Sequence, residues 1–377
     1  MFSNAFIPYR GYYSSPFVRY NRYFSQFNSI ELAALSSARW FDSKGISPAS
    51  IDNVIYGTSV HQKHGFWAGP WAATMMGAEH TTGHMTSQAC TTGATVLYQA
   101  AANIELGLGN TTYTLVSDRV SNGPVVEWGD GSHENWVNDN FSYDPSGKTG
   151  MLETAERVAR RYNIQRGELD EVATIRHEQY AAFARLRPEY MMPVCGVSDD
   201  VGIRRIDASR LATLPPAKED GVHSVGNCTY PADGHVGILV TDRNRARELN
   251  SEISVQIVSY GLSRCELSMM PVASVSASQM ALDRAGISIH DVGVINQHNA
   301  FAVNDVMFAR EMGIDPHNMN LPGGPLVYGH PQAPVLSRLV LEGIVESVER
   351  GGGYVLVTGA AGGDTGAAIL LKVSDFA

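Results

Sequence analysis

Two segments of the chain repeat one order of elements, and this repeat constrains the fold more than any other feature. Residues 31–56 have the pattern of a helix, a turn and a buried strand, and residues 273–296 have it again. Cys90 follows Val54 of the first strand by 36 positions, and His330 follows Val294 of the second strand by 36 positions. Alternating strands and helices predict mostly parallel sheets covered by helices.

The elements that follow Cys90 and His330 also correspond to one another. After Cys90 we expect a helix that ends at Gly107 and a strand over residues 112–116. After His330 we expect a helix over residues 336–348 and a strand over residues 354–357. Glycine just past the last periodic residue is a usual helix stop. Cys90 and His330 then occupy equivalent strand-to-helix turns, which a pseudo-twofold relation would bring together.

The repeat divides the chain into three parts. Residues 1–120 form the N-terminal half with Cys90, and residues 249–377 form the C-terminal half. Residues 121–248 form an insert, with helical patterns over 153–162 and 166–186. We interpret this insert as a lid-like subdomain that supplies much of a substrate tunnel.

Composition excludes several classes of protein. Of the 377 residues, 44% are hydrophobic and 18% are charged, which is typical of a globular chain. The net charge of −10 argues against nucleic-acid binding. No apolar run approaches the roughly 20 residues of a membrane span. The first residues lack the pattern of a secretory signal, so we expect a cytoplasmic protein.

The cysteines and histidines give no sign of a bound metal. The chain has four cysteines and no CxxC pair, so neither a disulfide framework nor a zinc site is expected. The only close histidine pairs are His61 with His64 and His80 with His84. No HExxH pattern surrounds them, and we predict no metal site.

Cys90 is the candidate nucleophile. Small residues and then a helix follow it, which places its sulfur at a helix N-terminus. Unpaired amides there favour an anion, so we expect a lowered thiol pKa. An inert buried cysteine is the alternative from local sequence. The equivalent turn at His330 favours the catalytic interpretation.

Two histidines and a glycine-rich segment complete the candidate site. His330 lies between Gly329 and Pro331, where a neutral imidazole could take a proton from a thiol. His298 follows the strand at Val294 and could donate a hydrogen bond to a thioester oxygen. Residues 359–366 are glycine-rich and could supply main-chain N–H groups to an oxyanion.

These motifs resemble those of the thiolase superfamily, in order along essentially the whole chain. Residues 323–331 resemble the GGxxxxGHP motif, and residues 298–302, HNAFA, resemble NEAFA. Residues 225–234 resemble the AGNxS…DG stretch, and residues 362–366 the C-terminal glycine motif. The start of the insert helix at Thr154 is similar to the TAE segment of the family's loop domain.

The resemblance implies a fold, a reaction and roles. The fold would be five-layered α/β/α/β/α, with two pseudo-symmetric halves and an inserted loop domain, in a homodimer. Coenzyme A would be a co-substrate, with no permanently bound cofactor. Cys90 would carry the acyl group and His330 would activate it, while His298 and His330 would bind one thioester oxygen. The oxyanion donor Gly362 would act with Cys90, and Thr229, Ala300 and Phe301 would line the pantetheine tunnel.

Three positions depart from the family pattern. Ala360 stands where ordinary thiolases have a second catalytic cysteine, and His298 and Asn299 replace the Asn and Glu of NEAFA. Losing the second cysteine removes the base that forms a carbanion, whereas a coenzyme A thiol ionises more readily. We therefore expect thiolytic cleavage of a β-ketoacyl-CoA, of an unusual or aromatic kind. The chain is similar to catalytic subunits of benzoylsuccinyl-CoA thiolases, which work with a small zinc-ribbon/OB-fold partner.

Two other functions stay open at this point. One is a condensing enzyme or C-acyltransferase that forms a C–C bond with the same Cys–His–His set. The other is an inactive thiolase-like scaffold subunit, which Ala360 and Asn299 would permit. Retention of Cys90 with both histidines favours an enzyme.

Overall fold

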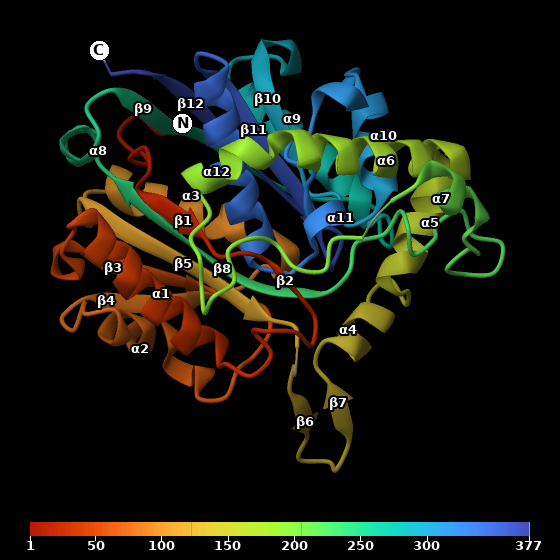
Figure 1. Ribbon diagram of the computed structural model, residues 1–377, viewed down its shortest axis with the longest axis horizontal. Coiled ribbons are helices and arrows are strands. Elements are labelled where there is room, and N and C mark those ends of the chain that lie inside the picture. The colour runs from red at the N-terminus through yellow and green to blue at the C-terminus, as the bar shows by residue number, and fades with distance from the viewer. Residues whose placement is uncertain (122, 205, 377) are drawn as a thin grey trace.

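A computed structural model of the chain describes residues 1–121, 123–204 and 206–376, and Figure 1 gives its arrangement. Its strands are β1 (Tyr12–Ser14), β2 (Val18–Arg19), β3 (Asn53–Gly57), β4 (Thr82–Thr86), β5 (Thr111–Arg119), β6 (Val125–Glu127), β7 (His133–Asn135), β8 (Ala232–Thr241), β9 (Ile253–Arg264), β10 (Val292–Gln297), β11 (Gly353–Ala361) and β12 (Thr365–Asp375). Its α-helices are α1 (Ser29–Lys44), α2 (Ala68–Met75), α3 (Thr92–Glu105), α4 (Asn138–Ser142), α5 (Met151–Arg161), α6 (Arg166–Ala182), α7 (Ala208–Thr213), α8 (Arg243–Leu249), α9 (Ala273–Ala285), α10 (Ala302–Met312), α11 (Pro325–Tyr328) and α12 (Pro334–Glu349).

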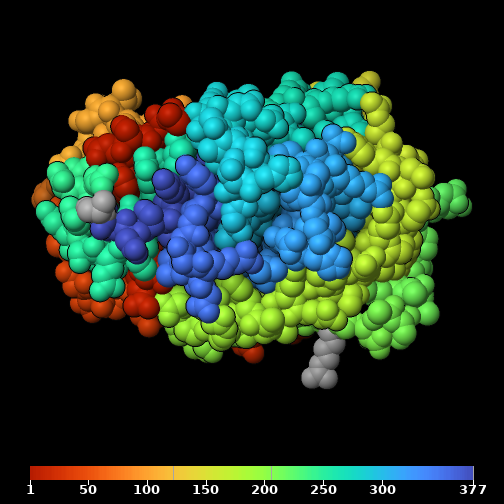
Figure 2. All heavy atoms as spheres, turned by 90° about the horizontal axis from the view of Figure 1, so that it is seen from above, coloured from red at the N-terminus to blue at the C-terminus, as the bar shows by residue number. Residues whose placement is uncertain are grey.

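One sheet forms the centre of each half. The first has the order β1-β8-β5-β3-β4, with β2 paired to β8, and the second has the order β10-β11-β12-β9. Helices α3 and α12 pack between the sheets, α1 and α2 cover the first sheet, and α9 covers the second, with α10 packed beside it. These layers are the five-layered α/β/α/β/α thiolase fold that the motifs predicted. Figure 2 shows the C-terminal half flanked by the N-terminal half on one side and by the insert on the other.

The internal repeat is present in three dimensions. Strand β3 lies parallel to β5 with Val54 beside Tyr113, and β10 lies parallel to β11 with Val294 beside Val355. The helix before each of these strand pairs ends at a left-handed glycine, Gly45 in α1 and Gly286 in α9. Glycine takes this conformation without a Cβ clash, so it ends both helices in the same way.

Two expectations about the sheets need correction. Both sheets are mixed, because β8 is antiparallel to β5 and β1, and β12 is antiparallel to β11 and β9. Strand β8 also falls within residues 121–248, yet it pairs in the sheet of the N-terminal half. Its ten residues are all buried, and its pairing with β5 assigns it to the first half. The part of the insert outside the two sheets therefore ends before Ala232.

The rest of the insert forms a separate layer beside the C-terminal half. Helices α5 and α6 pack against α10, and the hairpin β6–β7 projects from the body of the molecule. Val158, Leu169 and Ala173 of these helices share one buried cluster with Val303 and Met307 of α10. In the described part of the chain, no helix is both long and apolar enough to pass through a bilayer.

The close contact of α3 with α12 predicts an outcome for Gly93→Ala. A Cβ at Gly93 would lie 2.7 Å from Ser337 Oγ and would clash with the Ser337 amide nitrogen, which is closer still. We expect a loss of about 1–3 kcal/mol of unfolding free energy, because an overpacked helix contact must separate. Urea unfolding measures it. Gly167→Ala is the control, since nothing lies near that position, and equal stability of the two variants would contradict this packing.

Candidate active site

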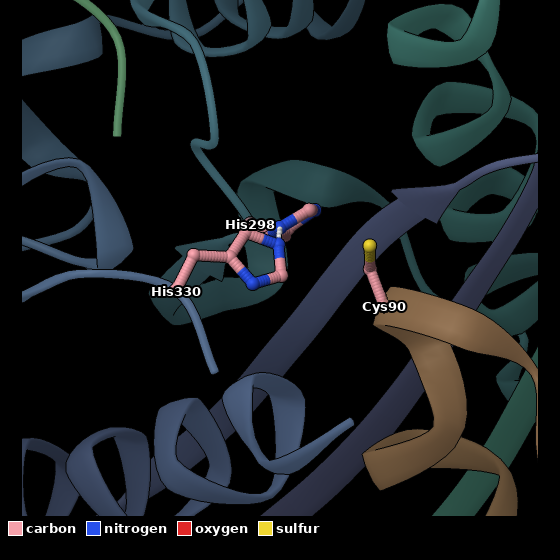
Figure 3. A group of neighbouring side chains, drawn as sticks. All are labelled: Cys90, His298 and His330. Atoms are coloured by element: carbon pink, nitrogen blue, oxygen red, sulfur yellow. Dashed lines mark hydrogen bonds between the residues drawn. The ribbon is translucent and has the colours of Figure 1, made fainter. Parts of the chain in front are cut away.

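Cys90, His298 and His330 meet between the two halves. Cys90 lies in the 3-10 turn Ala89–Thr91 before α3, His298 follows β10, and His330 precedes α12. The Cys90 sulfur and one nitrogen of each histidine all lie within 4.8 Å of one another (Figure 3). The three side chains are buried, with exposed fractions of 7% for Cys90, 1% for His298 and 4% for His330. The two turns that the repeat paired thus bring a thiol and two imidazoles together.

The two histidines form one hydrogen-bonded pair. Their Nε2 atoms are 2.6 Å apart, and the Gln332 main-chain N–H donates to His330 Nδ1 over 2.9 Å. Because Nδ1 accepts that bond, a neutral His330 carries its proton on Nε2 and donates it to His298 Nε2. The expectation of separate roles, a base at His330 and an oxygen donor at His298, did not include this direct link.

Burial keeps both rings neutral. Burial lowers the pKa of His298 to about 4, and the main chain of Ala360 offsets a part of this. Burial and the neighbouring His298 hold the pKa of His330 well below its ordinary value. A neutral pair retains an unprotonated nitrogen near neutral pH, which a proton acceptor needs.

The expected lowering of the Cys90 pKa is wrong for the resting chain. Burial raises the pKa of Cys90 to about 12, and the charge of Asp118 adds to the rise. The main-chain N–H groups of Cys90 and Gly362 lower this pKa, but burial outweighs them. The two N–H groups therefore lie close enough to Sγ to act on it, and Gly362 lines the cavity beside it.

Asp118 is a buried acid near the site that the sequence analysis did not single out. It lies in β5, and its carboxylate accepts bonds from Thr58, Ser59, Val60 and the Ala333 N–H. Burial raises its pKa to about 6, although these bonds lower it in part. Asp118 therefore joins the loop after β3 to the first turn of α12. The signal in the sequence was an acidic residue near the end of a strand that contains no other carboxylate.

Asn299, noted only as a departure, links the loops of the two histidines. Its Nδ2 donates to Asp305 over 3.0 Å and to the Gly323 carbonyl over 3.3 Å. Its Oδ1 accepts from the Leu326 N–H over 3.1 Å. An amide can make both kinds of bond, whereas a carboxylate could only accept and would face the charge of Asp305. The structure thus explains why Asn fits here.

Thr229, Ala300 and Phe301 lie together on two paired segments. The Thr229 N–H donates to the Ala300 carbonyl over 2.8 Å, and Cys228 forms an isolated antiparallel bridge with Phe301. The Thr229 hydroxyl donates to the Pro325 carbonyl over 2.5 Å. None of the three lines the cavity at Cys90, so their role in a tunnel stays a prediction for a path outside that cavity.

A cavity of about 320 Å³ opens at Cys90, and most of its far wall comes from the insert. Trp136, Phe141 and Tyr143 supply three aromatic rings, and Met151 adds a flexible apolar group. Among the described residues, the lining includes one carboxylate, Asp144, and no lysine, arginine or histidine. The cavity is therefore suited to an apolar and uncharged group next to the sulfur.

Comparison with known proteins decides the family. The model of the N-terminal thiolase domain matches residues 11–244, and that of the C-terminal thiolase domain matches residues 251–373. The chain belongs to the thiolase family. It is thus an acyl-CoA C-acyltransferase, with its substrate left open by these matches.

Relatives and solved structures match this thiolase over nearly its full length. It is 27% identical to a 3-ketoacyl-CoA thiolase of Bacillus subtilis (strain 168), covering 90% of this chain and 91% of the relative. It is 26% identical to the β-ketothiolase BktB of Cupriavidus necator, covering 91% and 92%. The acetyl-CoA acetyltransferase structure of Bacillus anthracis has a TM-score of 0.92 at 23% identity, covering 99% of each chain. The human mitochondrial 3-ketoacyl-CoA thiolase in complex with CoA has a TM-score of 0.91 at 22% identity, covering 98% of each chain.

The neutral histidine pair predicts an unusually low acid limb for the enzyme. A base must be unprotonated to act, and the pKa of His298 is lowered to about 4. We expect kcat/KM for acyl transfer to persist below pH 6. It should fall only as the pH approaches the lowered pKa of His298, about 4. A pH profile of the initial rate measures this limb. Asp118 also titrates nearby, so Asp118→Asn should leave the limb in place; a limb near 6.5 in both enzymes would contradict the assignment.

Proposed function

We propose that this thiolase cleaves a β-ketoacyl-CoA with coenzyme A through an acyl group on Cys90. The observation that carries the proposal is the meeting of Cys90 with the neutral pair His298–His330 inside one buried site. A thiol beside an unprotonated imidazole is an arrangement for nucleophilic catalysis.

The proton path follows from the hydrogen bonds. Cys90 gives its proton to His330 Nε2 while the former Nε2 proton of His330 passes to His298 Nε2. The thiolate attacks the β-carbonyl carbon, the bond between the α and β carbons breaks, and the leaving acyl-CoA takes up a proton from water at its α carbon. The coenzyme A thiol then attacks the acyl group and releases its proton to water, and Cys90 recovers its own proton from the histidine pair. The N–H groups of Cys90 and Gly362 would bind one oxyanion, and the Nε2 atoms of the histidines the other.

The surroundings of Ala360 favour cleavage over condensation. Ala360 is buried among Met270 and Ala273, where it offers no base. Asp364 is engaged by the main-chain N–H groups of Ser268 and Met269. Cys265 packs against the same cluster, but burial raises its pKa to about 12. Forming a carbanion needs a positioned base, whereas attack by a coenzyme A thiol depends on it less.

A second cavity supports a binding site for coenzyme A. It measures about 250 Å³ and is lined by Arg204, Arg210, Val225 and Gly226. The Arg204 side chain donates to the Cys228 carbonyl over 2.6 Å, beside the segment that carries Thr229. Guanidinium groups bind phosphate well, and in this acidic protein they would attract the nucleotide end of coenzyme A. Pantetheine would then run past Thr229, Ala300 and Phe301 towards Cys90. The structure of the similar human thiolase contains CoA.

The cavity at Cys90 supports an unusual acyl group. A dry cavity of about 150 Å³ accepts benzene, and this one measures about 320 Å³. Its three aromatic rings favour an aromatic acyl group, and Asp144 disfavours an anionic one. Such a substrate agrees with the proposed relationship to benzoylsuccinyl-CoA thiolases.

That relationship extends to assembly and location. Strand β4 pairs with β3 and forms an open edge of the first sheet within the described residues. Phe66 and Trp67 are exposed by 84% and 70%. We include a homodimer, and a small zinc-ribbon/OB-fold partner subunit, in the proposal. All four cysteines are free, in keeping with a reducing, cytoplasmic location.

The proposal predicts an aromatic acyl adduct on Cys90. Benzoylacetyl-CoA and acetoacetyl-CoA are mixed separately with the enzyme in the absence of free coenzyme A. We expect peptide mass spectrometry to find a benzoyl group on Cys90, formed faster than the acetyl group, and to find none after Cys90→Ser. Cys195→Ser is the control, since Cys195 is exposed and far from the histidines in sequence. An adduct on another cysteine, or none, would refute the proposal.

The absence of a base at Ala360 predicts slow proton exchange at the α carbon. The wild type should wash deuterium into the α position of a bound acyl-CoA far more slowly than it performs thiolysis. Ala360→Cys should speed this exchange more than it speeds thiolysis, because a thiol is restored there. Exchange is followed by mass spectrometry. Wild-type exchange that keeps pace with thiolysis would mean that another base is present.

A further inference from the structure

Gln332 is hydrogen-bonded to both the thiol of Cys90 and the imidazole of His330. It lies between His330 and α12, is 6% exposed, and lines the cavity at Cys90. Its side-chain Oε1 accepts a hydrogen bond from Cys90 Sγ over 3.3 Å. Its main-chain N–H donates to His330 Nδ1 over 2.9 Å. The proton position on His330 and the orientation of the thiol are thus fixed by one residue.

The backbone of Gln332 is in an unfavourable conformation for its residue type. Its φ is +69°, in the left-handed region that glycine adopts easily and glutamine rarely does. Such conformations persist where the surrounding structure holds them, and they cluster at functional sites. Glycine would fit this backbone conformation better, so the presence of glutamine indicates that its side chain has a function here.

The amide of Gln332 has an unused donor. Its Oε1 is bound by Cys90, while its NH₂ group has no acceptor among the described residues. Rotation of the terminal amide would exchange the two atoms beside the sulfur, since this torsion is broad and nearly two-fold. An amide can accept from a thiol and donate to a thiolate, which no single carboxylate or hydrocarbon side chain can do.

The sulfur needs such a donor. No cationic side chain lines the cavity in the part of the chain that the structure describes, and the main-chain N–H groups of Cys90 and Gly362 are the other donors acting on Sγ. Of the titratable groups nearby, His298 and His330 are neutral at rest, and Asp118 disfavours a thiolate by its charge. In a buried site, a donor to an anion contributes more than the same bond to a neutral group.

We propose that the Gln332 side-chain amide is a catalytic group that accepts from the Cys90 thiol at rest and donates to the thiolate once the proton has left. The S–H bond breaks, the proton passes to the histidine pair, and the amide rotates so that NH₂ faces sulfur. The role in catalysis rests on the proposed acyl-Cys90 reaction. The hydrogen bond to the sulfur belongs to the chain whatever its substrate is.

The test is the pH dependence of Cys90 alkylation by iodoacetamide, followed by peptide mass spectrometry in the full-length enzyme. Gln332→Met removes donor and acceptor at similar length, and Gln332→Glu keeps an acceptor but removes the donor. We expect Gln332→Met to alkylate about tenfold more slowly at pH 8 and to shift the profile upward by about one pH unit. Gln332→Glu should be slower still, because it adds a negative charge.

Controls separate this effect from misfolding. Gln62→Met removes an amide that, among the described residues, donates to the carbonyls of Val60, His61 and Arg119, and it should alkylate like the wild type. The exposed Cys195 should react at one rate in every variant if the fold is intact. An unchanged or faster rate at Cys90 in Gln332→Met, with Cys195 unaffected, would overturn the proposal. So would faster alkylation in Gln332→Glu.

The same enzymes distinguish this inference from the proposed function. If the wild type forms no acyl adduct on Cys90 but Gln332→Met still slows alkylation, the proposed thiolase reaction is wrong. The proposed contact of Gln332 with the thiolate is then still supported. If the wild type is acylated on Cys90 and Gln332→Met alkylates at the wild-type rate, only the proposed role of Gln332 is wrong. In steady state, Gln332→Met should lower kcat about tenfold with little change in KM, because the lost bond forms with the thiolate and not with bound substrate.

Discussion

At Gly93 the backbone of α3 lies directly against that of α12, with no side chain between them, and Ser337 Oγ lies within 3.4 Å of the Gly93 carbonyl oxygen. This contact sets the spacing of the two halves. Since Cys90 precedes α3 by one turn and His330 precedes α12, the same contact sets the distance between nucleophile and imidazole. Every later feature of the site depends on two helices that can approach to this distance.

The three side chains of the site are buried, and their burial explains its chemistry. Burial keeps Cys90 protonated and both histidines neutral, so the resting enzyme holds no separated charges among these three side chains. Hydrogen-bond donors then decide where a negative charge can form, because they act strongly where water is excluded. The N–H groups of Cys90 and Gly362 act in this way on Sγ, and the amide of Gln332 is held against it.

The sequence predicted the parts of this molecule that repeat or follow a periodic pattern. The equal spacers before Cys90 and His330 predicted their convergence, because related units pack about a common axis. Strand β8 was missed because its hydrophobic residues lie inside a segment that no repeat marks, and only pairing with β5 assigns it. The Cys90 pKa was misjudged because a helix N-terminus is visible in sequence and depth of burial is not.

The parts of the site that the sequence did not predict depend on contacts between segments far apart in the chain. Gln332 meets Cys90 across 242 positions of the chain, and no spacing rule connects a glutamine after GHP with a cysteine so far away. The aromatic wall of the cavity comes from residues around Trp136 and Phe141, in short irregular elements with no regular pattern. Side chains of this kind are recognised only when the tertiary packing brings them to the sulfur.

The central claim is that the convergence of the two halves makes His330 the proton acceptor for Cys90. The most direct test is the rate at which Cys90 becomes acylated in a single turnover, with β-ketoacyl-CoA mixed against excess enzyme and quenched for peptide mass spectrometry. Loss of a positioned base costs about 10²- to 10⁴-fold, so His330→Ala should slow acylation by that factor while substrate still binds. Acylation of His330→Ala at the wild-type rate would contradict the account.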